Sequence, residues 1–297
     1  MVFNHSRTMS LLPFLIFFSL AGCLPTKQAR IAAVAYTAED VFKAAVKQPD
    51  PTVVRRGSPA YLMLIDGLIE ADPHNGELLT AGCHSYTSYA SSFIEETDSA
   101  KAAILYAKAK DYGFRALSTK GNFQRAAAGR LDGFNTLLGT YEKEDVPALF
   151  CTCSAWAKWI SHNVDSVEAL ADLPMLEATI KRVIELDGSY HYGSPHVLMA
   201  VYLALKPTIL GGDMAEAKDH FDKAFALGAD KLLSAKVLFA KYYAVRIKNR
   251  DLFEKTLQHV IEAPVDEVRE LTLSNALAKE EARKLLEKED EYFVEVP

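Results

Sequence analysis

The stretch that decides the fold is Ala102-Ala-Ile-Leu-Tyr106-Ala-Lys-Ala109-Lys-Asp-Tyr-Gly113, in which Ala102, Tyr106 and Ala109 fall on one face of a helix. A small residue, a large residue four positions later and a small residue three positions beyond that allow a second helix to pack closely. The spacing recurs with small or apolar residues at Leu176, Ile180 and Val183, at Ala217, Phe221 and Ala224, and more weakly at Phe253, Leu257 and Val260. This recurrence is typical of helix-turn-helix repeats, and it matches the second helix of a tetratricopeptide repeat.

Apolar spacing of 3.6 residues continues through nearly the whole chain, with almost no strand-like alternation. The sequence therefore predicts an all-α protein, with tetratricopeptide-like helix pairs stacked around a concave face or central channel. A generic helical bundle is the alternative. Helices are predicted over residues 35–47, 59–71, 77–95, 99–118, 122–140, 146–161, 174–186, 195–205, 214–227, 231–248, 251–262 and 267–289.

Proline and glycine mark the breaks between these helices. The clearest break is Gly211-Gly212, which precedes Asp213 and Glu216. We expect Asp213 to cap the next helix with Glu216 as its capping-box partner, so that the glycine pair is a hinge. A phosphate-binding loop is not indicated, because the Lys-Ser/Thr of a nucleotide site does not follow.

The first residues have the form of a bacterial lipoprotein signal. A short apolar run follows Arg7 and ends in Leu20-Ala21-Gly22-Cys23, which predicts cleavage before Cys23 and lipidation of that cysteine. We expect residues 1–22 to be the signal peptide, 23–34 a lipidated tether and 35–297 a single helical domain. An ordinary secretory signal cut elsewhere is the alternative.

Net charge and hydropathy limit the classes of partner that we expect for this chain. The formal net charge is −6, and it becomes −7 when residues 1–22, which contain Arg7 and no acidic residue, are removed. A mildly acidic chain has no basic footprint for nucleic acid, so we expect no nucleic-acid partner. No later apolar segment approaches the length of a membrane span, so the membrane contact is expected to be the acyl chains on Cys23.

Three further cysteines, Cys83, Cys151 and Cys153, cannot all pair within one chain. Cys151 and Cys153 are two residues apart, so on a helix they point in different directions. We favour buried free thiols, with a bridge from Cys83 to Cys151 or Cys153 as the alternative.

Motifs for catalysis and metal binding are not apparent. The histidines lack the His-Glu-x-x-His spacing of a zinc site, no Gly-x-Ser-x-Gly elbow occurs, and the carboxylates fit solvated helix faces. We expect no enzyme activity, no metal and no cofactor.

Aromatic residues are the stronger candidates for binding a ligand or partner. Trp156 and Trp159 are the only two tryptophans, Tyr86 and Tyr89 begin a stripe that ends at Phe93, and Tyr192 and His196 lie in the segment 190–196. Such stripes are most often core, but buried indole and phenol groups need partners for their polar tips, and a ligand-binding groove would use them. We expect one indole to be structural and the other to face a channel.

Several motifs occur in the order found in one known family. They are Gly57-Ser-Pro-Ala-Tyr-Leu62, Ile69-Glu-Ala-Asp-Pro-His-Asn75, Ala155-Trp-Ala-Lys-Trp-Ile160, Ala171-Asp-Leu-Pro174, Tyr192-Gly-Ser-Pro-His196 and Lys206-Pro-Thr-Ile-Leu-Gly-Gly-Asp213. With them the chain resembles the T components of tripartite ATP-independent periplasmic (TRAP) transporters, over residues 51–260.

The resemblance implies a helical, tetratricopeptide-like lipoprotein that associates with the P subunit, the soluble substrate-binding protein of the transporter. It also implies a channel through the body that passes an organic-acid or apolar ligand, and assembly as a homotrimer. The matched motif positions are Trp156, Trp159, Gly193, His196, Pro207, Gly211 and Gly212; the last three also fit a structural loop. The alternative function is a tetratricopeptide scaffold for another envelope process, such as outer-membrane or cell-wall assembly.

Overall fold

The computed structural model describes residues 26–293, and every regular element in that range is a helix. The all-α prediction is confirmed, and the packing of successive helices is compatible with tetratricopeptide-like stacking. The α-helices are α1 (Lys27–Ala45), α2 (Pro51–Ala71), α3 (Gly76–Tyr89), α4 (Ser99–Leu117), α5 (Phe123–Ala127), α6 (Leu131–Leu138), α7 (Val146–Ser161), α8 (Val167–Ala171), α9 (Leu173–Asp187), α10 (Tyr190–Leu205), α11 (Met214–Ala224), α12 (Leu233–Leu238), α13 (Arg250–Glu262), α14 (Thr272–Glu287) and α15 (Glu289–Tyr292).

Shorter helical turns extend or join these helices. Three are π-helical and continue the preceding helix: η1 (Ala90–Ile94) after α3, η4 (Phe225–Ala229) after α11 and η5 (Phe239–Ala244) after α12. Three are 3-10 turns: η2 (Lys143–Asp145), η3 (Thr208–Leu210) and η6 (Arg269–Leu271). π-helical turns are rare and widen a helix locally, which redirects the side chains that follow.

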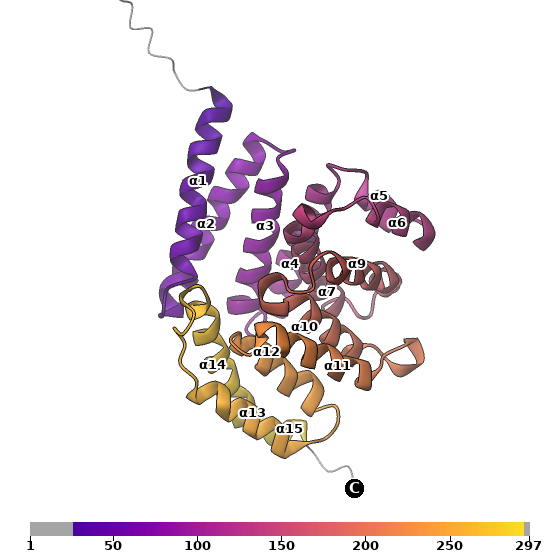
Figure 1. The fold of residues 1–297 in the computed structure, drawn as a ribbon. Coiled ribbons are helices and arrows are strands. Elements are labelled where there is room, and N and C mark those ends of the chain that lie inside the picture. Colours follow the sequence, from indigo (N-terminus) through magenta and orange to yellow (C-terminus); the bar gives the residue numbers. More distant parts are fainter. Residues whose placement is uncertain (1–25, 294–297) are drawn as a thin grey trace, which may run out of the picture.

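The helices form a curved succession in which neighbours in sequence pack on one another (Figure 1). The repeated spacing forms the contact faces, as expected: Tyr106, Ile180, Phe221 and Leu257 are all fully buried. Close approach is clearest at Gly82 of α3, where an added Cβ would lie 2.8 Å from both the Ile69 and Tyr112 side chains. The small positions therefore set how tightly α2, α3 and α4 stack.

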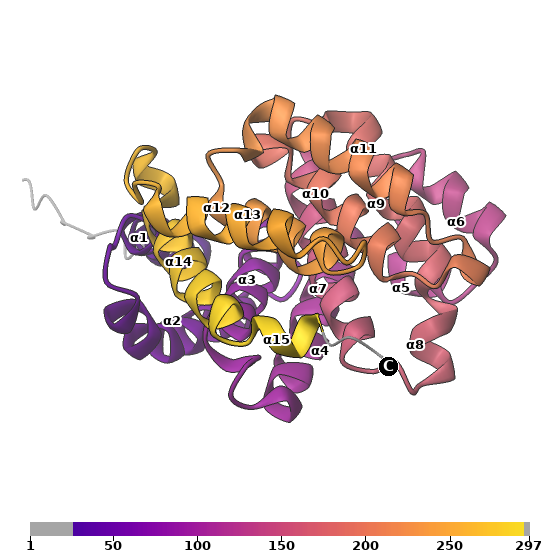
Figure 2. The ribbon, with the colours of Figure 1, turned by 90° about the horizontal axis from the view of Figure 1, so that it is seen from below.

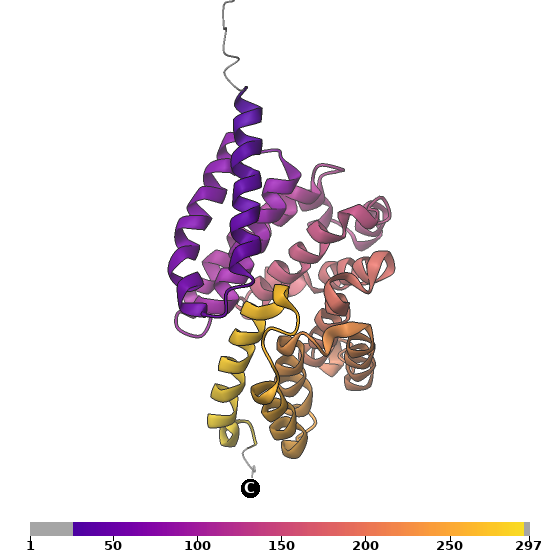
Figure 3. The ribbon, with the colours of Figure 1, turned by 60° about the vertical axis from the view of Figure 1, so that its left-hand side comes forward.

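Helix α14 brings the end of the succession back to its beginning. It packs against α12 and α13 through the buried residues Ala278, Ala282 and Leu285, and it also contacts α2. Figure 2 shows α14 between the α12–α13 pair and the first helices, and Figure 3 shows its upper end beside the lower ends of α1 and α2. The first and last parts of the domain are thus in direct contact.

Two predicted helix starts were placed too late. α1 begins at Lys27 rather than at residue 35, with Thr26 accepting the N–H of Ala29. α2 begins at Pro51 rather than at residue 59. Asp50 caps the helix by accepting the N–H of Thr52. Pro51 lies in the first turn, where a backbone N–H has no partner within the helix, so the N–H that proline lacks is not missed. Pro59 lies inside α2, on an exposed position.

Two long predicted helices are interrupted. The predicted helix over residues 122–140 is wrong as one element, because a turn closed by Gly129 N–H donating to the carbonyl of Ala126 separates α5 from α6. The predicted helix over residues 231–248 begins as the α-helix α12 and continues as the π-helical turn η5. By contrast, the cap at Asp213 is confirmed: its carboxylate accepts the N–H groups of Ala215 and Glu216.

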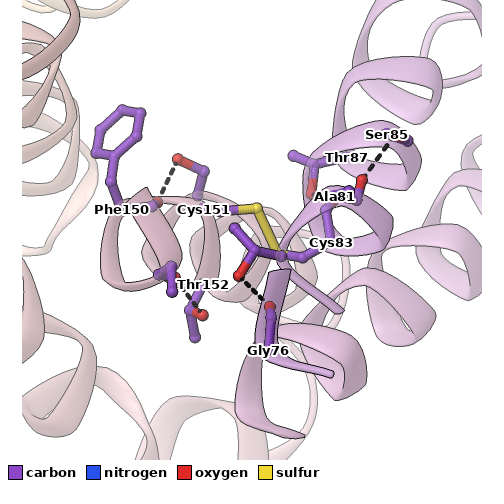
Figure 4. The surroundings of a disulfide bond; sticks show 11 residues. Gly76, Ala81, Cys83, Ser85, Thr87, Phe150, Cys151 and Thr152 are labelled. Carbon is purple, nitrogen blue, oxygen red and sulfur yellow. Dashed lines mark hydrogen bonds between the residues drawn. A yellow bond between two sulfur atoms is a disulfide. The ribbon is translucent and has the colours of Figure 1, made fainter. Parts of the chain in front are cut away.

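Cys83 of α3 and Cys151 of α7 form a disulfide, with their Cα atoms 6.3 Å apart (Figure 4). The favoured prediction of free thiols is wrong for these two, because α3 packs directly on α7 and brings residues 68 apart in sequence within bonding reach. Cys153 is a buried free thiol. Gly113 of α4 fits beside this junction, where a Cβ would lie 2.5 Å from Thr152 Oγ1 and 3.2 Å from Cys83 Sγ.

Within residues 26–293, none of the helices combines the length and apolar character that crossing a bilayer requires.

Candidate functional site

The most unusual backbone in the described chain is the start of α10. Three consecutive residues have left-handed conformations: His191 (φ 43°), Tyr192 (φ 60°) and Gly193 (φ 80°). For a residue other than glycine this region costs on the order of 1–3 kcal/mol, and such strain gathers at functional sites. We therefore treat this left-handed turn as the first part of the candidate site.

The surroundings hold the turn in place. Gly193 N–H donates to the carbonyl of Ser189 at 3.1 Å, and Ser194 Oγ donates to the carbonyl of His191 at 2.6 Å. A Cβ on Gly193 would lie 3.0 Å from the carbonyl oxygen of Ala224, so the turn presses directly on α11. Only glycine satisfies both the positive φ and this close approach.

The turn sends its aromatic side chains in two directions. Tyr190 packs on Phe150 of α7, with ring centroids 5.4 Å apart. Tyr192, a predicted binding residue, is half-buried and packs against the apolar cluster of Phe221 and Ala224 under η4. The structure thus places Tyr192 largely in packing, whereas Tyr190 and His191 lie on the other side of the turn.

His191 lies close enough to His84 of α3 for its charge to act on the His84 ring. Both rings are solvent-accessible, yet enough protein surrounds them that burial lowers both pKa values, that of His84 to about 4. The charge of His191 adds to the lowering at His84. Phe42 of α1 contacts the His84 ring edge-on at 5.2 Å.

We call Phe42, His84, Phe150, Tyr190 and His191 the histidine–aromatic face. The disulfide fixes it, since Cys83 precedes His84 and Cys151 follows Phe150. Figure 4 shows the two cysteines pointing toward each other while the Phe150 ring points away from them. The sequence singled out the segment 190–196, but it carried no signal that α1, α3 and α7 would meet there.

The two tryptophans have different environments. Trp156 is fully buried, its Nε1–H donates to Asp172 Oδ2 at 2.8 Å, and its ring meets Phe114 edge-on at 4.8 Å. Trp159 is half-buried, and Lys110 Nζ lies 3.4 Å above its ring centroid. Burial lowers the pKa of Lys110, partly offset by Asp172 at 3.8 Å. Trp156 is therefore a core residue with a satisfied N–H, and Trp159 is the indole with an accessible edge.

Residues 47–293 match the family model described as TRAP transporter T-component. The chain belongs to the TRAP transporter T-component family. Its members are accessory components of a transport system, and the match spans all the elements described above except α1. No sequence among the curated proteins matches this chain.

In this T component, His196 is buried one helical turn beyond the left-handed turn. Its Nδ1 lies 2.8 Å from Nδ1 of His220 on α11, so one imidazole donates and the other accepts. Burial, together with the neighbouring charges of His220 and Lys223, lowers the pKa of His196 to about 4. The predicted binding role of His196 therefore competes with a packing contact that holds α10 to α11.

The loop containing Pro207, Gly211 and Gly212 has tight steric requirements. Gly211 is left-handed (φ 93°), and Gly212 N–H donates to the Pro207 carbonyl at 3.1 Å. A Cβ on Gly212 would overlap the Lys206 carbonyl oxygen, at 1.8 Å. These contacts are what a structural loop requires.

Tyr86 belongs to a polar cluster that joins three helices of the T component. Asp66 of α2 accepts hydrogen bonds from Tyr86 at 2.7 Å and Tyr112 at 2.8 Å, and it pairs with Lys108 at 2.6 Å. Burial raises the pKa of the Asp66 carboxyl, but these three partners outweigh it, so the pKa is lower than usual. The Tyr86 hydroxyl is thus already used within the fold. Tyr89 is half-buried and lies 6.0 Å from the Phe93 ring.

A second ionic cluster was missed by sequence reasoning, which read charged residues as solvated faces. Glu95 binds Lys158 at 2.8 Å and accepts the Tyr106 hydroxyl at 2.7 Å. Nearby, Lys241 of η5 pairs with Glu281 of α14 at 3.1 Å. Burial disfavours the charged forms of Glu95 and Lys241, but their partners outweigh this effect. The pKa of Glu95 is therefore lower than usual, and the pKa of Lys241 is higher than usual.

Over residues 26–293, no group of three His, Cys, Asp or Glu side chains is arranged to hold a metal ion. The predicted lipidation site Cys23 lies outside the described residues.

Proposed function

We propose that this chain is a lipid-anchored accessory component of a TRAP uptake system that binds the P subunit and handles an organic ligand at the histidine–aromatic face. The family match over residues 47–293 carries the proposal. The strained backbone at His191 and Tyr192 supports it, because strain of this kind is kept where a site needs it.

The chemistry of the face indicates the kind of ligand. At neutral pH His84 is uncharged, since its pKa is about 4, so it offers one N–H donor and one acceptor nitrogen rather than a cation. The rings of Phe42, Phe150 and Tyr190 supply apolar surface. This combination suits a mainly apolar ligand with one hydrogen-bonding end better than a fully ionised organic acid.

Association with the P subunit is tested with purified proteins. Acylated T component in detergent is mixed with the P subunit of the same organism, and complex formation is followed by sedimentation velocity. We expect a complex whose mass fits a homotrimer of T components carrying P subunits. Its absence, with and without transported substrate, would contradict the proposal.

The ligand arm uses His191→Ala, with His74→Ala as the matched control because His74 is exposed in the loop before α3. The amount of organic ligand that copurifies with each variant is measured by mass spectrometry. We expect His191→Ala to lower this amount and His74→Ala to leave it unchanged. Equal amounts in both variants would remove the histidine–aromatic face from ligand handling.

The anchor is tested at Cys23. Cys23→Ser removes the acylated residue, and a processed variant should leave washed membranes, because acyl chains supply about 0.8 kcal/mol per buried methylene. Retention of the processed variant on membranes would show another anchor.

A further inference from the structure

The first half of α1 has an unusual surface for a helix on the outside of the domain. The sequence predicts a tether over residues 23–34, yet the chain is helical from Lys27. Among the described residues of α1, Ala38 alone is buried. Figures 1 and 3 show the first turns of α1 extending beyond the adjacent ends of α2 and α3. The start of α1 is therefore surrounded by little other protein.

This half of α1 is apolar on two opposite sides. Its inner side packs on the domain, where Ile31 and Ala35 are partly buried against the core cluster of α2 and α3. At about 100° per residue, the outer side consists of the exposed residues Ala29, Ala32, Ala33 and Tyr36. Tyr36 keeps 70% of its surface exposed. A helix normally carries charge on its outer side, and one that is apolar all round is typical of a helix that a second apolar surface covers.

The charges of α1 are divided between its two halves. Lys27 and Arg30 are exposed in the first half, and the sequence has no acidic residue between Cys23 and Glu39. In the second half, Glu39 pairs with Lys43 at 2.6 Å. The helix dipole opposes positive charge near a helix N-terminus, so Lys27 and Arg30 do not stabilise α1 itself. They suit an anionic surface outside the protein.

We propose that the first half of α1, residues 27–36, lies in the headgroup region of the membrane in which Cys23 is anchored. Lys27 and Arg30 pair there with the phosphates of anionic lipids, and the outer side faces the boundary with the acyl chains. Tyrosine, as at position 36, is enriched at this depth. The inference rests on the proposed acylation of Cys23, and it adds a contact made by the protein itself.

The short distance from the anchor supports a lipid surface as the occupant. Three residues separate Cys23 from Lys27 in the sequence, so even a fully extended chain spans at most about 14 Å between them. A second copy of the chain fits less well. Two copies that met symmetrically through this surface would bring Lys27 and Arg30 of both together, and such like charges repel.

The test measures how closely each half of α1 approaches lipid. Acylated protein with Ala33→Cys or Ala44→Cys is labelled with an environment-sensitive fluorophore. Both alanines are exposed, and they lie about three turns apart on the same side of α1. Cys153 is buried and so does not compete for the label. In vesicles of phosphatidylglycerol and phosphatidylcholine, we expect doxyl-labelled lipid to quench the probe at position 33 and to leave the probe at position 44 unquenched.

Charge variants test the pairing with anionic lipid. Lys27→Gln/Arg30→Gln should lower the ratio of lipid-contacting to free probe at position 33 by about tenfold or more in these vesicles. The matched control is Arg55→Gln/Arg56→Gln, which removes two exposed charges from the start of α2 and should leave the ratio unchanged. An unchanged ratio in a folded Lys27→Gln/Arg30→Gln protein would overturn the proposal.

Vesicle flotation reports the anchor separately from the contact of α1. Protein that does not float with vesicles would overturn both the acylation at Cys23 and this inference. Protein that floats but is quenched equally at positions 33 and 44 would overturn this inference alone. A blue-shifted probe at position 33 that lipid does not quench would also overturn it, because a second copy would then cover the surface.

Discussion

Leu273 donates its backbone N–H to the carbonyl oxygen of Val46, with the two atoms 3.0 Å apart. Val46 caps the end of α1, and Leu273 lies in the first turn of α14, so this bond joins the first helix to the last long one. Lys47 pairs with Glu270 at 3.7 Å beside it, and Lys284 pairs with Glu96 farther along α14. The succession of helices is closed on itself by specific contacts.

The closing helix should matter for stability through its buried face rather than its ion pairs. Leu285→Ala removes a buried side chain from the α12–α14 cluster and is expected to lower the free energy of unfolding by about 2–4 kcal/mol. Lys284→Gln, the adjacent exposed position, should cost no more than about 0.5 kcal/mol. Urea unfolding followed by circular dichroism gives both values, and equal losses would contradict this account.

The disulfide should stabilise the domain measurably. It closes a loop of 68 residues, for which chain entropy gives a stabilisation of about 4 kcal/mol, at the upper end of what disulfides typically contribute. We expect reductant to lower the midpoint of urea unfolding in the wild type and to have no effect on a Cys83→Ala/Cys151→Ala protein. A Cys153→Ala protein should keep the reductant effect, because Cys153 is unpaired. Insensitivity of the wild type would argue against the bond.

Truncation of the two tryptophans should have different effects on stability and on P-subunit association. Trp156→Ala empties a fully buried site and is expected to cost about 3–5 kcal/mol. Trp159→Ala, at a half-buried site, should cost clearly less and instead weaken P-subunit association if its accessible edge is a contact. Melting temperature and pull-down are compared for each variant. Equal destabilisation with association intact would assign both residues to the core.

The left-handed turn gives a glycine test with an internal control. Gly193→Ala must accept a positive φ and press a Cβ against Ala224, so we expect a loss on the order of 1–3 kcal/mol. Gly57→Ala, inside α2 with nothing within 4 Å of the added Cβ, should be neutral or stabilising by up to about 1 kcal/mol. Thermal unfolding decides between them, and a harmless Gly193→Ala would disprove the strained turn.

Acid should weaken the α10–α11 contact. The pKa of His196 is lowered from 6.5 to about 4, so the unfolded chain binds a proton that the folded chain refuses. The free energy of unfolding should therefore fall as pH drops from about 6.5 toward 4, by on the order of 1 kcal/mol from this residue after allowance for solvent screening. His196→Gln should reduce the slope of stability against pH in that window, and His74→Gln should not. An unchanged slope in His196→Gln would contradict the assignment.

Much of the fold was predictable from sequence because buried spacing is local. Tyr106, Ile180, Phe221 and Leu257 were identified as contact residues from positions three and four apart, and all are buried. Helix boundaries were less predictable. Pro59 was read as a start, although an exposed proline can be accommodated inside a helix whose true beginning is capped by Asp50.

The candidate site was less predictable, because it depends on contacts between distant segments. His84 and His191 are 107 positions apart in the sequence, and only the stacking of α3, α7 and α10 brings the charge of His191 close enough to lower the pKa of His84. Lys236 and His259 belong to no sequence motif, and only the fold of the π-helical turns brings Phe225 and Phe239 beside them. Charge pattern alone does not distinguish a solvated lysine from one in a groove.

The contact between α14 and the first two helices also bears on how such a chain can evolve. An open array of helix pairs can gain or lose a unit at either end, or within its length, and still present neighbours with matching faces. Here an added unit would separate Leu273 from Val46 and break the contact between α14 and the first two helices. Duplication or deletion of a single unit would break these contacts, so we expect related chains to differ in the length of their loops and to keep the number of helix pairs.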